Sequence, residues 1–234
     1  MQPNETVTAP VLFSRPWRQI VFMVLVMALV AVGAWFGIAT IEGIFWSNPY
    51  LNGAIIFVFF LGVLSCLRQV AQLLSSVRWI EGFAANPAGE SLAAPSLLAP
   101  LSTLLRSRGA RMQLSAPSTR SILDSVASRV DEDREITRYL ANILIFLGLL
   151  GTFYGLATTV PALVETIRSL NPTAGESGVE VFARLQAGLE RQLGGMGTAF
   201  SSSLLGLAGS LIVGLLELLV GHGQNRFYRE LEEW

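Results

Sequence analysis

The spacing of charged residues divides the chain into four long apolar stretches and the polar segments that join them. Asp, Glu, Lys and Arg are all missing from four windows, residues 19–41, 43–67, 139–164 and 192–216. Each window is longer than the roughly 20 residues with which a helix crosses about 30 Å of hydrocarbon. Because lipid offers the backbone no hydrogen-bond partners, helices are the expected structure. The pattern predicts an all-α membrane protein with four transmembrane helices and long helices that extend into the cytoplasm.

The first two apolar stretches predict an N-terminal hairpin. We expect its helices at about residues 18–41 and 52–75, joined by an outer turn at Glu42–Leu51. Trp46 and Tyr50 in that turn are typical of the aromatic belt at a membrane interface. The chain is accordingly divided into a disordered cytoplasmic tail (1–16), the transmembrane hairpin (17–75), a cytoplasmic segment (76–137), a second transmembrane pair (138–222) with an outer loop (161–193), and a cytoplasmic C-terminal helix (223–234).

The cytoplasmic segment changes character along its length. Residues 82–120 are rich in Ala, Ser, Pro and Leu, and four prolines interrupt any long helix there. Residues 121–139 are charged and periodic, and no helix breaker separates them from the third span. One continuous helix is therefore expected, with an apolar stripe that needs a neighbour to cover it and that contains Ile122, Val126, Val130 and Ile136.

The segment between the third and fourth spans allows two interpretations. Residues 171–178 (NPTAGESG) predict a loop, and apolar residues then recur at three- and four-residue spacing at Phe182, Leu185, Leu189 and Leu193. This periodicity fits an amphipathic helix on the outer membrane face. It fits equally well a solvated helix that leads directly into the fourth span.

The distribution of arginine predicts the orientation. All 16 basic residues are Arg, and only Arg168, Arg184 and Arg191 fall outside if the N-terminus is cytoplasmic, which leaves 13 of the 16 inside. Cytoplasmic segments of membrane proteins carry the excess of basic residues. We therefore expect both termini in the cytoplasm. The first apolar stretch is too long for a cleaved signal peptide and is expected to be an uncleaved anchor.

The third and fourth spans differ from the bulky first two because small and hydroxyl residues form a stripe on each. The stripe of the third span contains Gly148, Thr152, Gly155 and Thr159, and that of the fourth contains Ser203, Gly206, Ser210 and Gly214. One interpretation is tight helix packing, for which membrane proteins use small residues. The other is the wall of a narrow polar lumen, in which hydroxyls bind water or a partner side chain.

Two motifs in these spans resemble those of the MotA/TolQ/ExbB proton-channel family. GLLGTFYGL (148–156) is similar to the family's G-L-x-G-T-x-x-G, and GGMGTAFSSSLLGLAGS (194–210) is similar to its G-I-A-E-A-L-x-x-T-x-x-G-L. The resemblance covers roughly residues 120–230 and includes the basic segment before the third span. It places Thr152 and Ser203 at the two threonines of the family motifs, with Ser202 beside them. Thr198 stands where the family has glutamate, which is a departure that puts an acidic outer gate in doubt.

The resemblance implies a subunit of a bacterial inner-membrane complex that conducts H⁺ and needs no cofactor. Such proteins form homo-oligomeric rings, typically pentamers, around a single-span ExbD/TolR/MotB-like partner with a membrane aspartate. Ion flow would turn the ring and do mechanical work, although the energised process stays open. The channel- or partner-facing residues would be Thr152, Ser203, Ser202, Thr198, Gly148, Gly155, Thr159, Gly206 and Ser210.

The ionisable residues of the chain agree with a channel in which the partner supplies the titrating carboxyl. A proton path normally needs an intramembrane ionisable residue, and the middles of the third and fourth spans have none. Glu217 could supply a charge at the inner mouth, and Glu165 lies at the outer end of the third span. Both could instead be interfacial charges that face headgroups. If the chain takes part in proton conduction, the titrating group is therefore expected on another polypeptide. The alternative function is that of a non-conducting membrane scaffold.

Other function classes receive little support from the composition. The net charge of −1 and the pI of about 5.9 do not favour a nucleic-acid partner. With no Lys there is no phosphate-binding loop of the Walker type, and a single His, His222, gives no credible catalytic triad. Cys66 is the only cysteine, so neither a disulfide nor a multi-cysteine metal site is expected. An enzyme is not expected.

Overall fold

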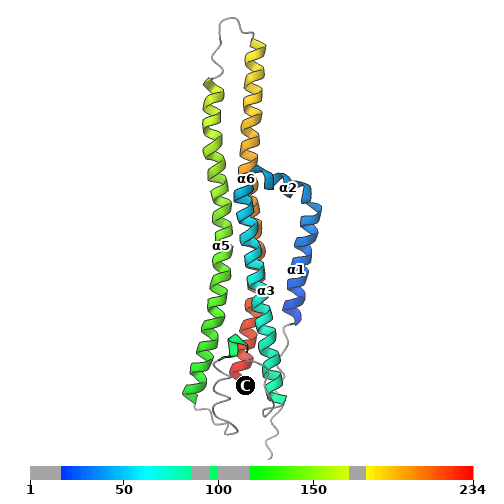
Figure 1. Cartoon of the computed structure of the whole chain (residues 1–234), viewed down its shortest axis with the longest axis vertical. Helices are drawn as coiled ribbons and strands as arrows, with labels where there is room; N and C mark the ends of the chain where they lie inside the picture. The colour runs from blue at the N-terminus through cyan, green and yellow to red at the C-terminus, as the bar shows by residue number, and fades with distance from the viewer. Residues whose placement is uncertain (1–16, 86–94, 100–115, 169–177, 234) are drawn as a thin grey trace, which may run out of the picture. The chain divides into compact units, whose positions relative to one another are not determined.

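The computed structural model describes residues 17–85, 95–99, 116–168 and 178–233, and it is helical with no strand in these ranges. Figure 1 shows the elements, which are α1 (Trp17–Phe36), α2 (Ile38–Ser47), α3 (Pro49–Ala85), a 3₁₀ turn η1 (Ser96–Leu98), α5 (Ala116–Arg168) and α6 (Gly178–Glu233). Four of them, α1, α3, α5 and α6, contain stretches long and apolar enough to cross a membrane. The all-α membrane fold with four spans is confirmed.

The two longest helices continue well beyond their apolar windows. The continuous helix expected from residue 121 into the third span is present, because α5 runs from Ala116 to Arg168 and includes Pro161. The segment 161–193, predicted as the outer connection between the third and fourth spans, is helical at residues 161–168 and 178–193, and its place outside the membrane stays a prediction. Of the two interpretations of that region, the structure shows the helix that leads directly into the fourth span, because α6 has no break after Gly178. Of the predicted loop 171–178, Gly178 is the first residue of α6, and residues 171–177 lie outside the described residues, as does the tail 1–16.

The connection between the first two spans also differs from the prediction. Instead of a turn at Glu42–Leu51, the short helix α2 occupies Ile38–Ser47. Gly37 separates it from α1, and Asn48 ends it in a non-helical conformation. Pro49 then begins α3, where its missing N–H is no disadvantage because the first turn of a helix leaves its N–H groups unpaired. The helical stretch was missed because it is shorter than the periodic windows on which the prediction rested.

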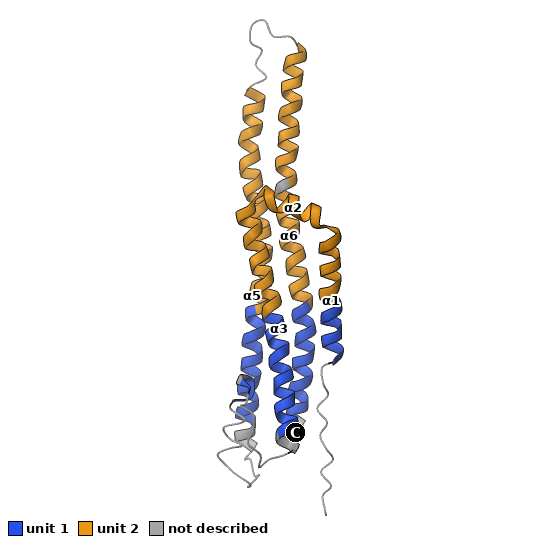
Figure 2. Cartoon of the chain, turned by 45° about the vertical axis from the view of Figure 1, so that its right-hand side comes forward, with its two compact units in different colours: residues 1–25, 65–136, 216–234 blue, residues 26–64, 137–215 orange. Residues whose placement is uncertain are grey.

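The chain forms two compact units, coloured separately in Figure 2. Unit 1 comprises residues 1–25, 65–136 and 216–234, and unit 2 comprises residues 26–64 and 137–215. Unit 1 has an apolar core, and α3, η1, α5 and α6 all contribute side chains to it. Its buried members are Leu73, Val77, Trp79, Ile80, Leu97, Leu98, Ile122, Val126, Val130, Phe227 and Leu231.

This core covers the predicted apolar stripe of α5 with one exception. Ile122, Val126 and Val130 are buried as expected, but Ile136 is 47% exposed and Thr137 is fully buried in its place. The reason is helical geometry, because seven residues make about two turns and six do not. The position that returns to the buried face after Val130 is therefore 137. The linker contributes as well, since Leu97 and Leu98 of η1 pack into the core.

Matched substitutions on α5 test this core. Replacing Ile122 by alanine should lower the free energy of unfolding of unit 1 by about 2–5 kcal/mol, because a buried side chain is lost and a cavity remains. Ile136→Ala, the same change on the exposed side of the same helix, should stay within about 1 kcal/mol of the wild type. The stability of both variants is measured by thermal unfolding in detergent. Tryptophan fluorescence monitors the unfolding, and the core residue Trp79 contributes to this signal. Equal destabilisation by the two variants would contradict the assigned core.

Candidate functional site

In unit 2, glycines of α5 and α6 bring the two helix backbones into direct contact. A Cβ built on Gly206 would lie 2.5 Å from the carbonyl oxygen of Leu144 and 2.8 Å from the Cα of Gly148. A Cβ built on Gly148 would lie 3.1 Å from the carbonyl oxygen of Ser203. Real Cβ atoms do not approach backbone so closely, so only glycine fits at Gly206. The motif glycines Gly148 and Gly206 therefore meet each other within one chain.

The contact continues along both helices as a seam in which one helix or the other supplies a glycine. The pairs are Gly151 with Ser202, Gly155 with Ala199, Gly195 with Thr159 and Gly188 with Thr166. A Cβ on Gly155 would overlap the Ala199 side chain, and one on Gly188 would overlap Thr166. Such small-residue contacts are the usual means of packing helices in lipid. We call these contacts, from Gly148–Gly206 to Gly188–Thr166, the α5–α6 seam.

The predicted site residues divide between the α5–α6 seam and its edge. Gly148, Gly155, Thr159, Ser202 and Gly206 lie in the seam and are buried. Ser210 is also buried, whereas Thr152 and Ser203 are only half-buried. Gly214 is half-buried, with nothing near its Cβ position. The side chain of Thr198 lies outside the described residues. The structure thus brings the two predicted stripes together, but mainly against each other.

Helix α3 covers one side of the α5–α6 seam. Leu51 of α3 lies 3.2 Å from the Cβ position of Gly151, and Phe59 of α3 lies 3.4 Å from that of Gly209. Ser202 belongs to the same side, because its Cβ lies 2.7 Å from the Cβ position of Gly151. A helix turns by about 100° per residue. The next residue on each helix, Thr152 on α5 and Ser203 on α6, is therefore turned toward the opposite side.

Several threonine and serine hydroxyls of these spans donate to carbonyl oxygens of their own helices. The Oγ1 of Thr152 donates to the Leu149 carbonyl at 2.7 Å, and that of Thr159 donates to the Leu156 carbonyl at 3.3 Å. Ser201 donates likewise to the Gly197 carbonyl at 2.8 Å. A hydroxyl whose proton is engaged in this way still has lone pairs that can accept a hydrogen bond. Thr152, which is half-buried, can therefore act as an acceptor toward a neighbouring group.

Glu217, the candidate for a charge at the inner mouth, belongs to α6 in unit 1. Its side chain is half-buried and acts electrostatically on Cys66 of α3. Cys66 itself is fully buried. Glu217 thus lies near the packed α3–α6 contact, and in the sequence it directly follows the charge-free window 192–216.

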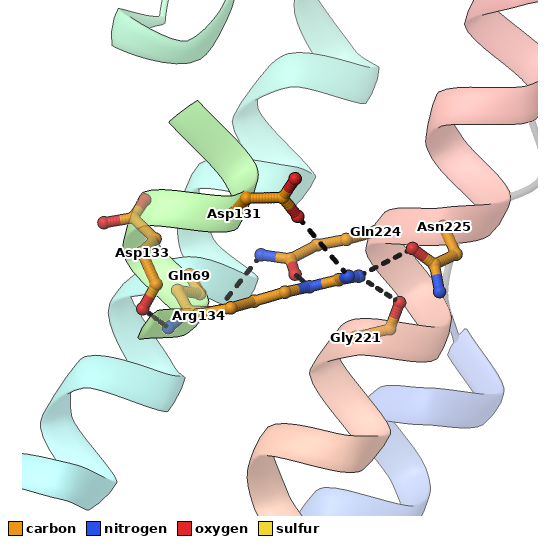
Figure 3. A network of polar contacts seen from close by, with 7 residues as sticks. All are labelled: Gln69, Asp131, Asp133, Arg134, Gly221, Gln224 and Asn225. Atoms are coloured by element: carbon orange, nitrogen blue, oxygen red, sulfur yellow. Dashed lines mark hydrogen bonds and ion pairs between the residues drawn. The ribbon is translucent and has the colours of Figure 1, made fainter. Parts of the chain in front are cut away.

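Unit 1 contains a polar network that the sequence analysis missed, drawn in Figure 3. The Nε of Arg134 donates to Gln224 Oε1 at 2.7 Å, and its Nη2 donates to the Gly221 carbonyl at 2.7 Å and to Asn225 Oδ1 at 2.8 Å. Gln224 Nε2 in turn donates to Gln69 Oε1 at 3.1 Å. Residues of α3, α5 and α6 are thereby joined by side-chain hydrogen bonds.

Asp133 completes the network, in which the side-chain amides of the two glutamines are buried. Gln69 Nε2 donates to the Asp133 carbonyl at 3.0 Å, and Arg68 pairs with the Asp133 carboxylate at 2.6 Å. Gln69 and Gln224 are almost fully buried. The sequence did contain a signal for both, because each stands where the helical repeat of buried apolar residues, such as Leu73 or Val220, requires another core position.

Together these features define a multi-span helical membrane protein in which α3, α5 and α6 are packed closely in each unit. Comparison of the chain with models of protein families, with curated proteins and with solved structures gave no match. The two sequence motifs and the geometry of the α5–α6 seam are therefore the basis for a functional proposal.

The α5–α6 seam makes a prediction about two glycines of the membrane spans. Gly155→Ala should lower the free energy of unfolding by about 1–3 kcal/mol, because the added methyl overlaps Ala199 and the helices must move apart. Gly214→Ala should be neutral or stabilising, since nothing lies within 4 Å of that Cβ position and alanine favours the helix. Thermal unfolding of the two variants in the same detergent is the measurement. A stable Gly155→Ala protein would show that α5 and α6 are not in contact there.

The polar network makes a second prediction. Gln224→Leu should cost about 1–3 kcal/mol, because the Arg134 Nε and the Gln69 Oε1 both lose a partner in a buried place. Asn225→Ala removes only one exposed contact of the same Arg134 and should cost less than about 1 kcal/mol. Unfolding midpoints of both variants give the comparison. If Gln224→Leu were as stable as the wild type, the network would contribute little to unit 1.

Proposed function

We propose that the chain is a ring-forming subunit of an ion-motive-force-driven complex in the bacterial inner membrane, related to the MotA/TolQ/ExbB family. It would act as a proton channel or stator and couple ion flow to mechanical work through a single-span, aspartate-bearing partner. The observation that carries the proposal is the placement of Thr152 and Ser203. Both turn to the side of the α5–α6 seam that α3 leaves uncovered, and both are half-buried.

The two hydroxyls can serve both protonation states of a partner carboxyl. The Thr152 proton is held by the Leu149 carbonyl, so its oxygen would accept the O–H of a protonated carboxylic acid. The Ser203 hydroxyl can donate to the ionised carboxylate. The proton would be carried by the partner, because the charge-free windows 139–164 and 192–216 offer no titratable group.

The exposed surface of the spans is compatible with a ring of such subunits. Large apolar side chains of α6 point away from the seam, among them Phe200, Leu204 and Leu211. Lipid or a neighbouring copy would cover them equally well. In the ring, which the family resemblance puts at five copies, the side with Thr152 and Ser203 would face the partner, and Ser210 would lie one level further along α6.

A second candidate, a non-conducting membrane scaffold, is favoured by the α5–α6 seam itself. Gly148, Gly155 and Gly206 are all used for packing inside one chain. Assembly of helices alone would explain these glycines. It would not explain why the small residues at 152 and 203 carry hydroxyls.

Proton flux into liposomes that contain the chain and its single-span partner separates the two candidates. Removal of both hydroxyls by Thr152→Val with Ser203→Ala should reduce flux by about tenfold or more, the factor given by a lost interaction of about 1.4 kcal/mol. Thr158→Val is the matched control, because Thr158 also donates within its own helix but lies on another face of α5. Its flux should equal that of the wild type.

Two further variants identify the scaffold. If the chain only assembles helices, Thr152→Ala should be harmless, since it keeps the residue small, while Thr152→Leu should disrupt assembly. The channel requires that both reduce flux. Unchanged flux in the Thr152→Val, Ser203→Ala double variant, with assembly intact, would refute the assigned roles of the two hydroxyls.

A further inference from the structure

Helix α2 is fixed to the beginning of α3 by specific contacts. The Nδ2 of Asn52, a fully buried residue of α3, donates to the Ile44 carbonyl at 2.6 Å, close to the end of α2. Phe45 of α2 lies against Gly53, with its ring 4.0 Å from the Cβ position of that glycine. The Asn48 side chain accepts from the Leu51 N–H at 3.4 Å and closes the corner between the helices. The direction of α2 is therefore set by side-chain contacts with α3.

The two spans that flank α2 determine its depth in a membrane. Helix α1 has 20 residues, which corresponds to about 30 Å and thus to the thickness of the hydrocarbon layer. Exposed tryptophans stand at its two ends, Trp17 and Trp35. Because α2 begins two residues after Phe36 and ends two residues before the start of α3, each of its ends adjoins a helix that contains a candidate span.

Apolar and polar residues of α2 gather on different sides of the helix. Ile38, Ile41 and Phe45 follow the i, i+3, i+7 pattern of one helix face, and Thr40, Gly43 and Ser47 follow the same pattern on the opposite face. Ile41 and Phe45 are half-buried, and the exposed Glu42 borders the apolar face beside Ile38. Ile38 is 61% exposed and Trp46, at the border between the faces, is 69% exposed. Phe36 and Tyr50 on either side of α2 are exposed as well.

We propose that α2 is an interfacial helix that lies in the lipid headgroup layer and holds the end of α1 at a fixed depth and distance from α3. Its ligand is the lipid surface itself. The exposed Ile38 of its apolar face, with the exposed Phe36 and Tyr50 on either side of α2, would lie against lipid beside the candidate spans of α1 and α3. Trp and Tyr are the residues that this layer favours, because their rings are apolar and their N–H or O–H groups meet water. The proposal does not depend on proton conduction.

Spin labels on a cysteine-free background test the proposal in the full chain reconstituted in liposomes. Cys66→Ala removes the native thiol, and single cysteines are then introduced as Ile38→Cys, Thr40→Cys or Gly43→Cys. All three positions are exposed in the structure, and nothing lies within 4 Å of the Gly43 Cβ position. Leu64→Cys on the exposed face of α3 gives the lipid standard, and Glu132→Cys on α5 gives the water standard.

The expected result is an alternation of collision rates along α2. The measured quantity is the ratio of the collision rate with oxygen, which concentrates in lipid, to the collision rate with a water-soluble nickel complex. This ratio should be several-fold higher for the label at 38 than for the labels at 40 and 43. Equal and high access of nickel to all three labels would place α2 in water and overturn the proposal. Low access of both reagents would show that protein, such as a second copy, covers α2, and would overturn it as well.

Quenching of the native tryptophans provides a second test that introduces no label. The emission of Trp46 is obtained as the difference between the wild type and Trp46→Phe. Lipids brominated near the glycerol end of the chains should quench it more than lipids brominated near the methyl end. Trp79 is buried in the core of unit 1, so the corresponding difference for Trp79→Phe should respond to neither lipid. Stronger quenching of Trp46 by the deep label, or none by either, contradicts a headgroup location.

Discussion

Contact between the backbones of α5 and α6 at Gly148 and Gly206 is the constraint from which the arrangement of unit 2 follows. In lipid there is little hydrophobic gain when two helices associate, so close packing has to supply the attraction. That requires glycine at the point of contact, because a Cβ on Gly206 would meet the Leu144 carbonyl. Once these residues face each other, the large side chains of both helices must point outward, and the positions of Thr152 and Ser203 relative to α3 are determined.

The sequence was sufficient for the features that depend on charge and on helical repeats. The charge-free windows identified the four spans, and the absence of a breaker before residue 139 correctly gave one long helix in α5. It was insufficient where tertiary contacts decide. In the segment 161–193 the local repeat predicted a helix over residues 182–193, but it could not predict the contacts of Thr166 with Gly188 and of Thr159 with Gly195. Ile136 was misplaced because a stripe was extended by six residues instead of seven.

For the candidate site the sequence supplied the residue types and their spacing, and the structure shows which of these residues pack inside the chain and which lie at the edge. From the sequence, all residues of a small-residue stripe were expected to serve the same purpose. The structure separates them, since Gly155 and Ser202 serve packing while Thr152 stands at the edge. The helical repeat marks Gln69 and Gln224 as core positions, but the network that joins them with Arg134 could not be predicted, because these residues are far apart in the chain and become neighbours only through the packing of α3, α5 and α6.

A hydroxyl in a membrane helix does not by itself require a polar pathway, because a donor such as Thr152 is satisfied by its own helix at the Leu149 carbonyl. Thr158 is hydrogen-bonded in the same way. Thr152 differs from it because Thr152 has a hydroxyl neighbour, Ser203, on α6. The seam contacts Gly148–Ser203 and Gly151–Ser202 put Thr152 and Ser203 at a similar level of the helix pair and on the same side of it. An acceptor at Thr152 and a hydroxyl donor at Ser203, with no acid or base in the adjacent span windows, would together form half of a proton-transfer site. If the chain conducts protons, the other half has to come from a second polypeptide.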